Sequence, residues 1–294
     1  MTASWERRPP VLSYLELCKP GLSLLVASAA VAGYLTASPR WSDDLIWTWS
    51  GVLILAAGAA ALNQYQDRRV DARMERTRGR PLPSGGIPPS RALGFSLLLL
   101  AAGLMILSLG GSRPVILGAA AAAWYNGVYT PLKKISPFAA VPGALSGALA
   151  PAVGWAFAGG RLDDPRIAAL ALLLFVWQIP HFWLVAIARA GEYRAAGVPN
   201  VLDVVSESQA RRIVAHWVLA TAVGTVIIAG WGTFQIPLTR WGVLATSLWL
   251  AGRALGFRAS AVRQESSLFR TMNLHMLAVL ALICLDSLLQ HTFL

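Results

Sequence analysis

Three oxygen-bearing side chains recur at four-residue intervals in the first polar stretch of the chain. Asn63, Asp67 and Asp71 occupy positions i, i+4 and i+8, so on a helix all three lie along one face. Such oxygens suit Mg²⁺, which shares its remaining coordination positions with water and substrate phosphates. The spacing therefore predicts a magnesium site at the end of an apolar helix. The competing interpretation is that both aspartates pair with neighbouring arginines on a solvated turn.

Arginines follow these carboxylates closely in the sequence. Arg76 and Arg80 are predicted to bind substrate phosphate oxygens, because a guanidinium group binds two oxygens at once. Carboxylates next to an arginine cluster are typical of a site for a metal-bound, highly anionic ligand. The segment therefore predicts chemistry on a phosphorylated substrate.

Two other polar segments carry groups that could complete such a site. Glu192 is predicted to supply a second metal site, and Arg194 a further phosphate contact. A shorter loop adds Tyr129, a candidate catalytic residue, and Lys133, a candidate diphosphate contact. An excess of lysine on one membrane face would also explain Lys133.

One of the histidines, His181, lies within an apolar segment directly after Pro180. Ionisable groups inside membrane spans are functional candidates by default, so His181 is a candidate substrate-binding residue. The alternative is that His181 only forms a hydrogen bond with a neighbouring helix.

The composition places these groups in a membrane protein. Of 294 residues, 56% are hydrophobic and only 13% are charged, and the mean hydropathy is +0.56. Charged residues are about a quarter of a typical soluble domain. A water-exposed fold is therefore excluded, and an all-α, polytopic membrane protein is predicted. The two cysteines, Cys18 and Cys284, do not indicate a disulfide framework.

Apolar stretches long enough to cross a bilayer recur along the whole chain, which we interpret as one transmembrane domain, 1–294. The nine predicted spans are 18–37, 45–65, 92–110, 114–131, 138–158, 166–187, 213–231, 236–254 and 271–290. Two long polar loops, 66–91 and 188–212, are predicted to be functional. Gly143 and Gly147 have the spacing that lets helix backbones approach closely.

The distribution of basic residues predicts the orientation. Of the 25 Lys and Arg residues, 20 fall on the face that holds the N-terminal segment 1–17 and both long loops, and the other face keeps five. By the positive-inside rule, the N-terminus and both loops are cytoplasmic. The net charge of +11 is thus a consequence of topology, and a nucleic-acid partner is not expected.

These motifs together resemble the UbiA superfamily of intramembrane prenyltransferases. The first aspartate-rich motif of that family is similar to Asn63-x3-Asp67-x3-Asp71-x4-Arg76-Thr77-x2-Arg80-Pro81. Its protoheme IX farnesyltransferase (heme O synthase) branch is the most similar. That likeness rests on Met74-Glu75-Arg76-Thr77, Tyr129-Thr130-Pro131-Leu132-Lys133-Lys134, Pro180-His181-Phe182-Trp183 and Glu192-Tyr193-x3-Gly197-Val198-Pro199.

The resemblance implies a helical bundle around a lipid-accessible cavity in the cytoplasmic (inner) membrane. It implies transfer of a farnesyl group from farnesyl diphosphate to a vinyl group of haem B, forming haem O. Mg²⁺ would be held by Asn63, Asp67, Asp71 and Glu192, with Arg76, Arg80, Lys133 and Arg194 on the diphosphate and His181 facing the haem. Hand-over of the product to a haem A synthase or a terminal oxidase is a further implication.

The acceptor stays open at this stage. The second motif begins with Glu192 where the family has Asp, and Asn200-Val201-Leu202-Asp203 replaces the family's Met-Leu-Pro. A UbiA-type enzyme acting on a quinone precursor or a chlorin is therefore an alternative. A transporter of an anionic lipid or of haem is a third hypothesis, although transport does not require paired aspartates at helical spacing.

Overall fold

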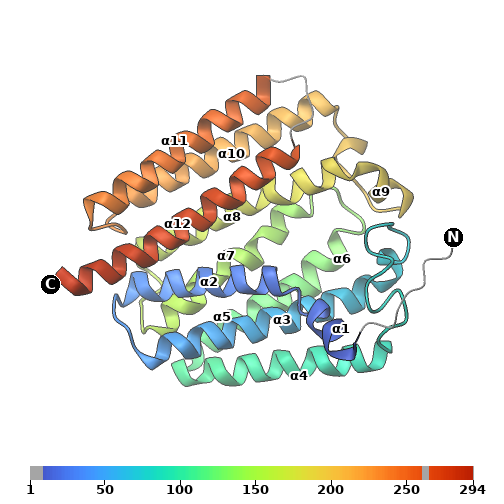
Figure 1. Cartoon of the computed structure of the whole chain (residues 1–294), viewed down its shortest axis with the longest axis horizontal. Helices are drawn as coiled ribbons and strands as arrows, with labels where there is room; N and C mark the ends of the chain where they lie inside the picture. Colours follow the sequence, from blue (N-terminus) through green and yellow to red (C-terminus); the bar gives the residue numbers. More distant parts are fainter. Residues whose placement is uncertain (1–8, 260–264, 294) are drawn as a thin grey trace.

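The fold is all-helical across the part of the chain that the structure describes. The computed structural model describes residues 9–259 and 265–293, and within these ranges it contains helices and no strands (Figure 1). The long helices are α2 (Pro20–Ala37), α3 (Asp43–Asp71), α4 (Pro89–Leu107), α7 (Ala140–Phe157), α8 (Pro165–Ala188), α10 (Glu207–Gly230), α11 (Pro237–Ala259) and α12 (Glu265–Phe293). The predicted fold class is confirmed.

Shorter helical pieces join the long ones. They are α1 (Pro10–Leu17), α5 (Ser112–Ala123), α6 (Thr130–Leu132), α9 (Ala190–Ala195), two 3₁₀ turns (Ser108–Gly110 and Val201–Asp203) and a π-helix (Trp124–Tyr129). The π-helix links α5 to α6 without a break, so one helical segment runs from Ser112 to Leu132.

The predicted count of nine membrane spans is not confirmed. Among the described residues, seven helices are long and apolar enough to cross a membrane, namely α2, α3, α4 with its following turn, α7, α8, α10 and α12. The other two predicted spans fall on α5 with the π-helix and on α11. Helix α5 has 12 residues before the wider turn begins, and α11 carries Arg240, Arg253 and Arg258. An integral membrane protein is confirmed, whereas the count of nine is not.

Glycines set the closest approach between helices. A Cβ at Gly154 of α7 would lie 1.8 Å from the carbonyl oxygen of Ala30, and one at Gly33 of α2 would lie 2.0 Å from that of Pro151. Helices α2 and α7 therefore touch through their backbones, and only glycine fits at these two positions.

The predicted role of Gly143 and Gly147 in backbone contact is wrong. A Cβ at Gly143 would meet the ring of Tyr129 at 2.3 Å, and a Cβ at Gly147 would meet Gln178 Oε1 at 2.0 Å. Both glycines instead make room for side chains that point at α7 from other helices.

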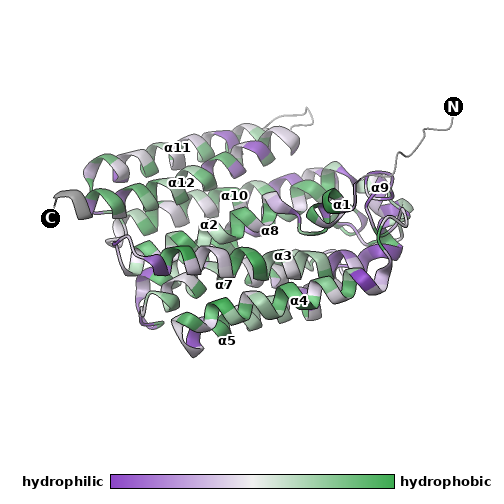
Figure 2. Ribbon diagram, turned by 60° about the horizontal axis from the view of Figure 1, so that its bottom comes forward, coloured by the Kyte–Doolittle hydropathy of each residue, from purple (hydrophilic) through white to green (hydrophobic). Residues whose placement is uncertain are grey.

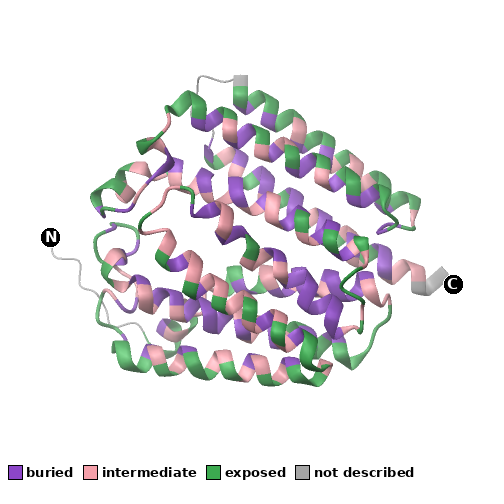
Figure 3. Ribbon diagram, turned by 180° about the vertical axis from the view of Figure 1, so that it is seen from behind, coloured by how far each residue is buried: buried purple, intermediate pink, exposed green. Residues whose placement is uncertain are grey.

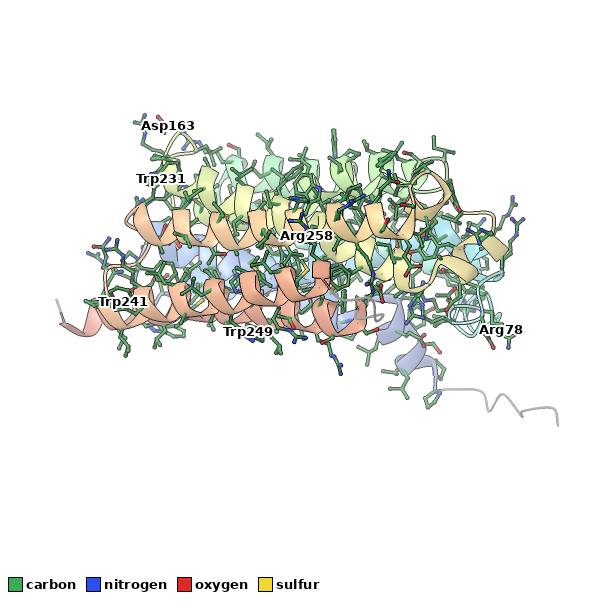
Figure 4. The ribbon with its side chains drawn as sticks, turned by 90° about the horizontal axis from the view of Figure 1, so that it is seen from above. Arg78, Asp163, Trp231, Trp241, Trp249 and Arg258 are labelled. Carbon is green, nitrogen blue, oxygen red and sulfur yellow. The ribbon has the colours of Figure 1, made fainter. Side chains whose placement is uncertain are left out.

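The two ends of the bundle differ in polarity. Hydrophobic residues follow the helices, whereas hydrophilic ones gather at the ends (Figure 2). Exposed residues concentrate on the outer helices and the connecting segments, and buried ones on the inner helices (Figure 3). Arg78 lies at one end, and Asp163, Trp231 and Trp241 lie at the opposite end (Figure 4). We call the end formed by residues 72–88 and α9 the basic end.

Both predicted functional loops are shorter and more ordered than expected. Helix α3 continues to Asp71, so residues 66–71 of the predicted loop 66–91 are helical and its carboxylates stand on a helix. Helix α9 and a 3₁₀ turn interrupt the predicted loop 188–212, and α10 begins at Glu207. In the N-terminal segment, α1 ends at Leu17, which packs beside Ala61 and Leu82.

Alanine substitutions test the contact between α2 and α7. Gly154→Ala places a methyl group against a backbone carbonyl that cannot rotate away, so we expect the variant to lose about 1–3 kcal/mol of stability. Gly94→Ala is the matched control, because a Cβ at Gly94 of α4 meets nothing within 4 Å. Thermal unfolding in detergent micelles measures both variants. Equal midpoints would show that the glycine contact does not hold the helices together.

Candidate active site

One cavity at the basic end brings most of the predicted site residues together. It has a volume of about 320 Å³ and lies between α3, the π-helix, α8 and the segment after α3. We call it the site cavity. Eight of the ten predicted residues line it: Asn63, Asp67, Asp71, Arg76, Arg80, Tyr129, Lys133 and His181.

The three oxygen-bearing residues of α3 are buried and share one face, as predicted. Asn63, Asp67 and Asp71 are 2%, 5% and 6% exposed. Asn63 Nδ2 donates to Asp67 Oδ2 at 2.9 Å and to Thr130 Oγ1 at 3.0 Å, which orients the first carboxylate toward α6. The backbone oxygen of Asp71 accepts from Thr77 Oγ1 at 2.9 Å, which fixes the end of α3 to the following turn.

Cations from distant parts of the chain pair with these carboxylates. Asp67 forms an ion pair with Lys133 Nζ, and Lys134 Nζ lies 3.2 Å from Asp67 Oδ1. Arg80 Nη1 donates to Asp71 Oδ2 at 2.8 Å. The interpretation that the aspartates pair with adjacent arginines is wrong for Arg68, which donates to the carbonyl oxygen of Tyr65 instead.

Lys19 is a site residue that the sequence analysis missed. Its Nζ donates to Asn63 Oδ1 at 2.8 Å, and its backbone has a φ of 45° at the start of α2. Burial, reinforced by the nearby cations Lys133 and Arg80, lowers the pKa of Lys19 to about 7. The available signal was a lysine directly before Pro20, at the border of a predicted span.

A row of stacked aromatic rings borders the site cavity. The rings of Tyr125 and Tyr129 are 5.6 Å apart, and those of Tyr129 and Phe182 are 5.2 Å apart. Two of these rings, Tyr125 and Tyr129, belong to the π-helix. In its wide turn the carbonyl oxygen of Tyr125 accepts a hydrogen bond from Thr130 Oγ1 at 2.8 Å. π-Helical turns are frequent at functional sites.

A second, apolar cavity adjoins the first. It has a volume of about 120 Å³, and its lining residues come from α2, α3, α5, α7 and α8. Leu22, Tyr125 and Phe182 line both cavities, so the aromatic row lies on the border between them. We call it the apolar cavity. A ligand spanning the border would place a charged head among the cations and a hydrocarbon tail among aliphatic side chains.

His181 is held by α12. Its Nδ1 lies 3.0 Å from Asn273 Oδ1, and its ring lies between Trp177 and Phe269, at centroid distances of 4.8 and 4.7 Å. An amide oxygen can only accept, so Nδ1 carries the proton and Nε2 keeps a free lone pair.

Arg194 is not part of the site cavity. It is exposed and its Nη2 lies 3.2 Å from Asp203 Oδ1. Asp203 in turn accepts from the backbone N–H of Asn200 at 2.8 Å, which completes the cap of the following 3₁₀ turn. A local carboxylate therefore holds Arg194 away from the predicted diphosphate position.

Glu192 also lies outside the lining of the site cavity. Arg189 Nη1 donates to Glu192 Oε1 at 3.1 Å, whereas the buried Oε2 has no hydrogen-bond partner. Among the described residues, no three His, Cys, Asp or Glu side chains gather closely enough to hold a metal by themselves. A second metal site at Glu192 stays a prediction.

The cations of the site repel one another. Burial and the neighbouring Arg80 and Arg189 lower the pKa of Arg76. Among the described residues, the lining of the site cavity includes five basic and two acidic side chains. A polyanion entering the cavity would relieve this repulsion, whereas a neutral ligand would not.

Comparisons with known proteins agree with this geometry. Residues 24–277 match the model of the UbiA prenyltransferase family. The chain belongs to the UbiA prenyltransferase family. It is 40% identical over 260 residues to the protoheme IX farnesyltransferase of Geobacter sulfurreducens, covering 88% of this chain and 93% of that protein. It is 36% identical to the protoheme IX farnesyltransferase of Oleidesulfovibrio alaskensis, covering 90% and 92%.

Solved structures of UbiA-type proteins share the fold. A structure of digeranylgeranylglyceryl phosphate synthase superposes with a TM-score of 0.77 at 16% identity and covers 95% of this chain and 99% of that one. A UbiA homologue from Archaeoglobus fulgidus bound to GPP and Mg²⁺ superposes with a TM-score of 0.67 at 16% identity, covering 92% and 99%. The predicted UbiA-type architecture is confirmed.

The different surroundings of Arg80 and Arg194 give a testable contrast. Arg80→Ala removes a cation that lines the site cavity, so we expect it to weaken binding of Mg²⁺ with inorganic diphosphate by about 10- to 100-fold. Arg194→Ala removes an exposed cation paired with Asp203, and we expect its affinity to stay within about twofold of wild type. Titration calorimetry measures both. If Arg194→Ala loses as much affinity as Arg80→Ala, Arg194 does contact the diphosphate.

Proposed function

We propose that this enzyme transfers the farnesyl group of farnesyl diphosphate to a vinyl group of haem B, with release of diphosphate. Water then adds to the resulting cation and a proton is lost, giving the hydroxyethylfarnesyl side chain of haem O. The observation that carries the proposal is the buried Asn63, Asp67 and Asp71 stripe in a cationic cavity that continues into an apolar one. Such a border suits a prenyl diphosphate, with a charged head and a hydrocarbon tail. The acceptor is supported by the relatives, which are named protoheme IX farnesyltransferase.

The donor atoms on α3 fit a magnesium ion. Asp67 Oδ1 is buried and accepts no hydrogen bond, although Lys134 Nζ lies 3.2 Å away, so a lone pair is available. Asn63, Asp67 and Asp71 would hold the ion from one side, and Glu192 would offer its unpartnered oxygen from the facing segment. When bound, Mg²⁺ supplies charge neutralisation of the departing diphosphate. The A. fulgidus homologue, bound to GPP and Mg²⁺, supports this assignment.

The basic side chains of the cavity assist departure of the diphosphate. Cleavage of the allylic C–O bond leaves negative charge on the leaving oxygen, and fixed cations in a site shielded from water stabilise that charge. Arg76, Arg80 and Lys133 line the cavity and are proposed to contact the diphosphate oxygens. Lys19 adds a fourth cation, beside Asn63.

The aromatic row is placed to stabilise the allylic cation. Tyr125, Tyr129 and Phe182 present stacked rings where the head of the substrate meets its tail. The face of an aromatic ring attracts a cation, by about 2 kcal/mol or more when water is excluded. In this proposal Tyr129 is catalytic through its ring, and the apolar cavity protects the cation from stray water.

His181 is proposed to bind the haem. Its free Nε2 lone pair suits an iron ligand, and its ring is fixed by Asn273 and two aromatic neighbours. The proposal extends to an inner-membrane location with the basic end in the cytoplasm, as the positive-inside distribution favours. Release of haem O to a haem A synthase or a terminal oxidase is part of the same proposal.

Isosteric substitutions of the carboxylates test the reaction. Asp67→Asn and Asp71→Asn keep the side-chain volume and remove the charge that would hold the metal. With haem B present, we expect each variant to lower the rate of Mg²⁺-dependent diphosphate release from farnesyl diphosphate by at least about 100-fold. Asp163→Asn, an exposed position at the opposite end, is the matched control and keeps full activity.

The product identifies the acceptor. Mass spectrometry of the wild-type reaction with haem B is expected to show farnesylated, hydrated haem. If the enzyme prenylates a quinone precursor or a chlorin and does not prenylate haem, haem B is not the acceptor. No diphosphate release with any acceptor would refute the enzyme itself and favour transport.

The haem contact has its own spectroscopic test. His181→Ala removes the proposed axial nitrogen, so we expect the Soret band of bound ferric haem to shift and turnover to fall at least about tenfold. His216→Ala is the control, because His216 is exposed on α10 and bonds the carbonyl oxygen of Arg212. Unchanged spectra and turnover in His181→Ala would remove this residue from the site.

A further inference from the structure

A third cavity lies against the outer side of the site cavity. It has a volume of about 690 Å³ and is bordered by the junction of α1 and α2, by Gln64 of α3 and by residues 75–80. We call it the outer cavity. Glu75 on its lining has a side chain that is 84% exposed, so the cavity opens to the surroundings at the basic end.

Side chains form the partition between the outer cavity and the site cavity. Lys19, Arg76 and Arg80 line both cavities, together with Leu22. The charged ends of two of them point inward, because Lys19 Nζ bonds Asn63 Oδ1 at 2.8 Å and Arg80 Nη1 bonds Asp71 Oδ2 at 2.8 Å. The partition consists of long side chains, so it can open by rotamer changes of Lys19, Arg76 and Arg80, without movement of a helix, once an anion replaces the partners of Lys19 and Arg80.

The lining of the outer cavity carries less net positive charge than the lining of the site cavity. Among the described residues, the site cavity has five basic and two acidic side chains, and the outer cavity has three basic and two acidic ones. The acids that line only the outer cavity are Glu16 and Glu75. An anion moving outward thus stays in contact with the shared cations but meets a weaker positive field, which lets it leave.

The apolar cavity, which also adjoins the site cavity, is an unfavourable route for an anion. Leu22, Tyr125 and Phe182 mark the border with the apolar cavity, where a diphosphate would lose its hydration without compensating partners. The two products of a prenyl transfer therefore need different routes, one through hydrocarbon and one through water.

We infer that the outer cavity is the exit by which inorganic diphosphate passes from the site to water, with Lys19, Arg76 and Arg80 as its movable partition. The inference rests on the proposed function, which supplies the diphosphate. These three cations would therefore act twice. They would contact the diphosphate in the site cavity, and they would contact it again as it passes into the outer cavity. The prenylated product would leave separately, on the side of the apolar cavity.

A bulky residue in the outer cavity tests the route. Gly21 lines this cavity, and a Cβ there meets nothing within 4 Å, so Gly21→Trp narrows the passage without strain at the substituted position. Gly94→Trp, equally open but on α4, is the matched control. The probe is inorganic diphosphate with Mg²⁺, followed by stopped-flow binding. We expect Gly21→Trp to slow association and dissociation equally, by about tenfold or more, with an unchanged Kd.

A releasable label at position 21 separates blocking of the passage from misfolding of the Trp variant. Gly21→Cys is labelled with a benzyl methanethiosulfonate, and the label is then released with dithiothreitol. Wild type treated in the same way controls for the two native cysteines, Cys18 and Cys284. Slow exchange that returns to the wild-type rate on release supports the exit. Wild-type exchange rates in both the Trp variant and the labelled Cys variant would overturn it. Failure of wild type to bind Mg²⁺ and diphosphate at all would instead refute the proposed function.

Discussion

A charge buried in a lipid-embedded protein must have a partner, and this requirement governs the structure around α3. Asp67 and Asp71 are almost fully buried and each pairs with a cation from another part of the chain. Lys133 follows α6 and Arg80 follows α3, so pairing with the two carboxylates joins both segments to α3. In the segment after α3, buried Met74 and Leu82 add apolar contacts. In the proposed reaction, the same acids and bases would exchange partners when a metal and an anion bind together.

The sequence predicted the helices and the central site well because both depend on local periodicity. Spacing by four residues was enough to place Asn63, Asp67 and Asp71 on one face, and the structure shows them there. Apolar runs likewise predicted every long helix. The count of nine stays unconfirmed at the two segments where a wide turn shortens the α-helix or where arginines lower the hydropathy.

What the sequence could not predict depends on tertiary partners. Arg194 carries the same charge as Arg80, yet a capping carboxylate, Asp203, turns it away from the cavity. Lys19 reaches Asn63 from a residue whose backbone is in the left-handed region, directly before α2. Gly143 looked like a helix contact, and its real neighbour, the ring of Tyr129, comes from a different segment. In each case the deciding feature is a contact made only in the folded chain or a single torsion angle, and neither follows from the spacing of residues in the sequence.

The π-helix also changes the phase of its segment. Each residue of an α-helix advances the side-chain direction by about 100°, and a turn with one more residue shifts everything after it by that angle. Residues before Trp124, such as Ile116, can therefore point at lipid, while Tyr125, Tyr129 and Lys133 line the site cavity. A helical wheel drawn with one period through 112–132 would therefore give the wrong side-chain directions for the residues after the π-helix. Loss or gain of a single residue here would change the direction of Tyr129, the tyrosine proposed to be catalytic, while leaving the apolar composition of the span intact.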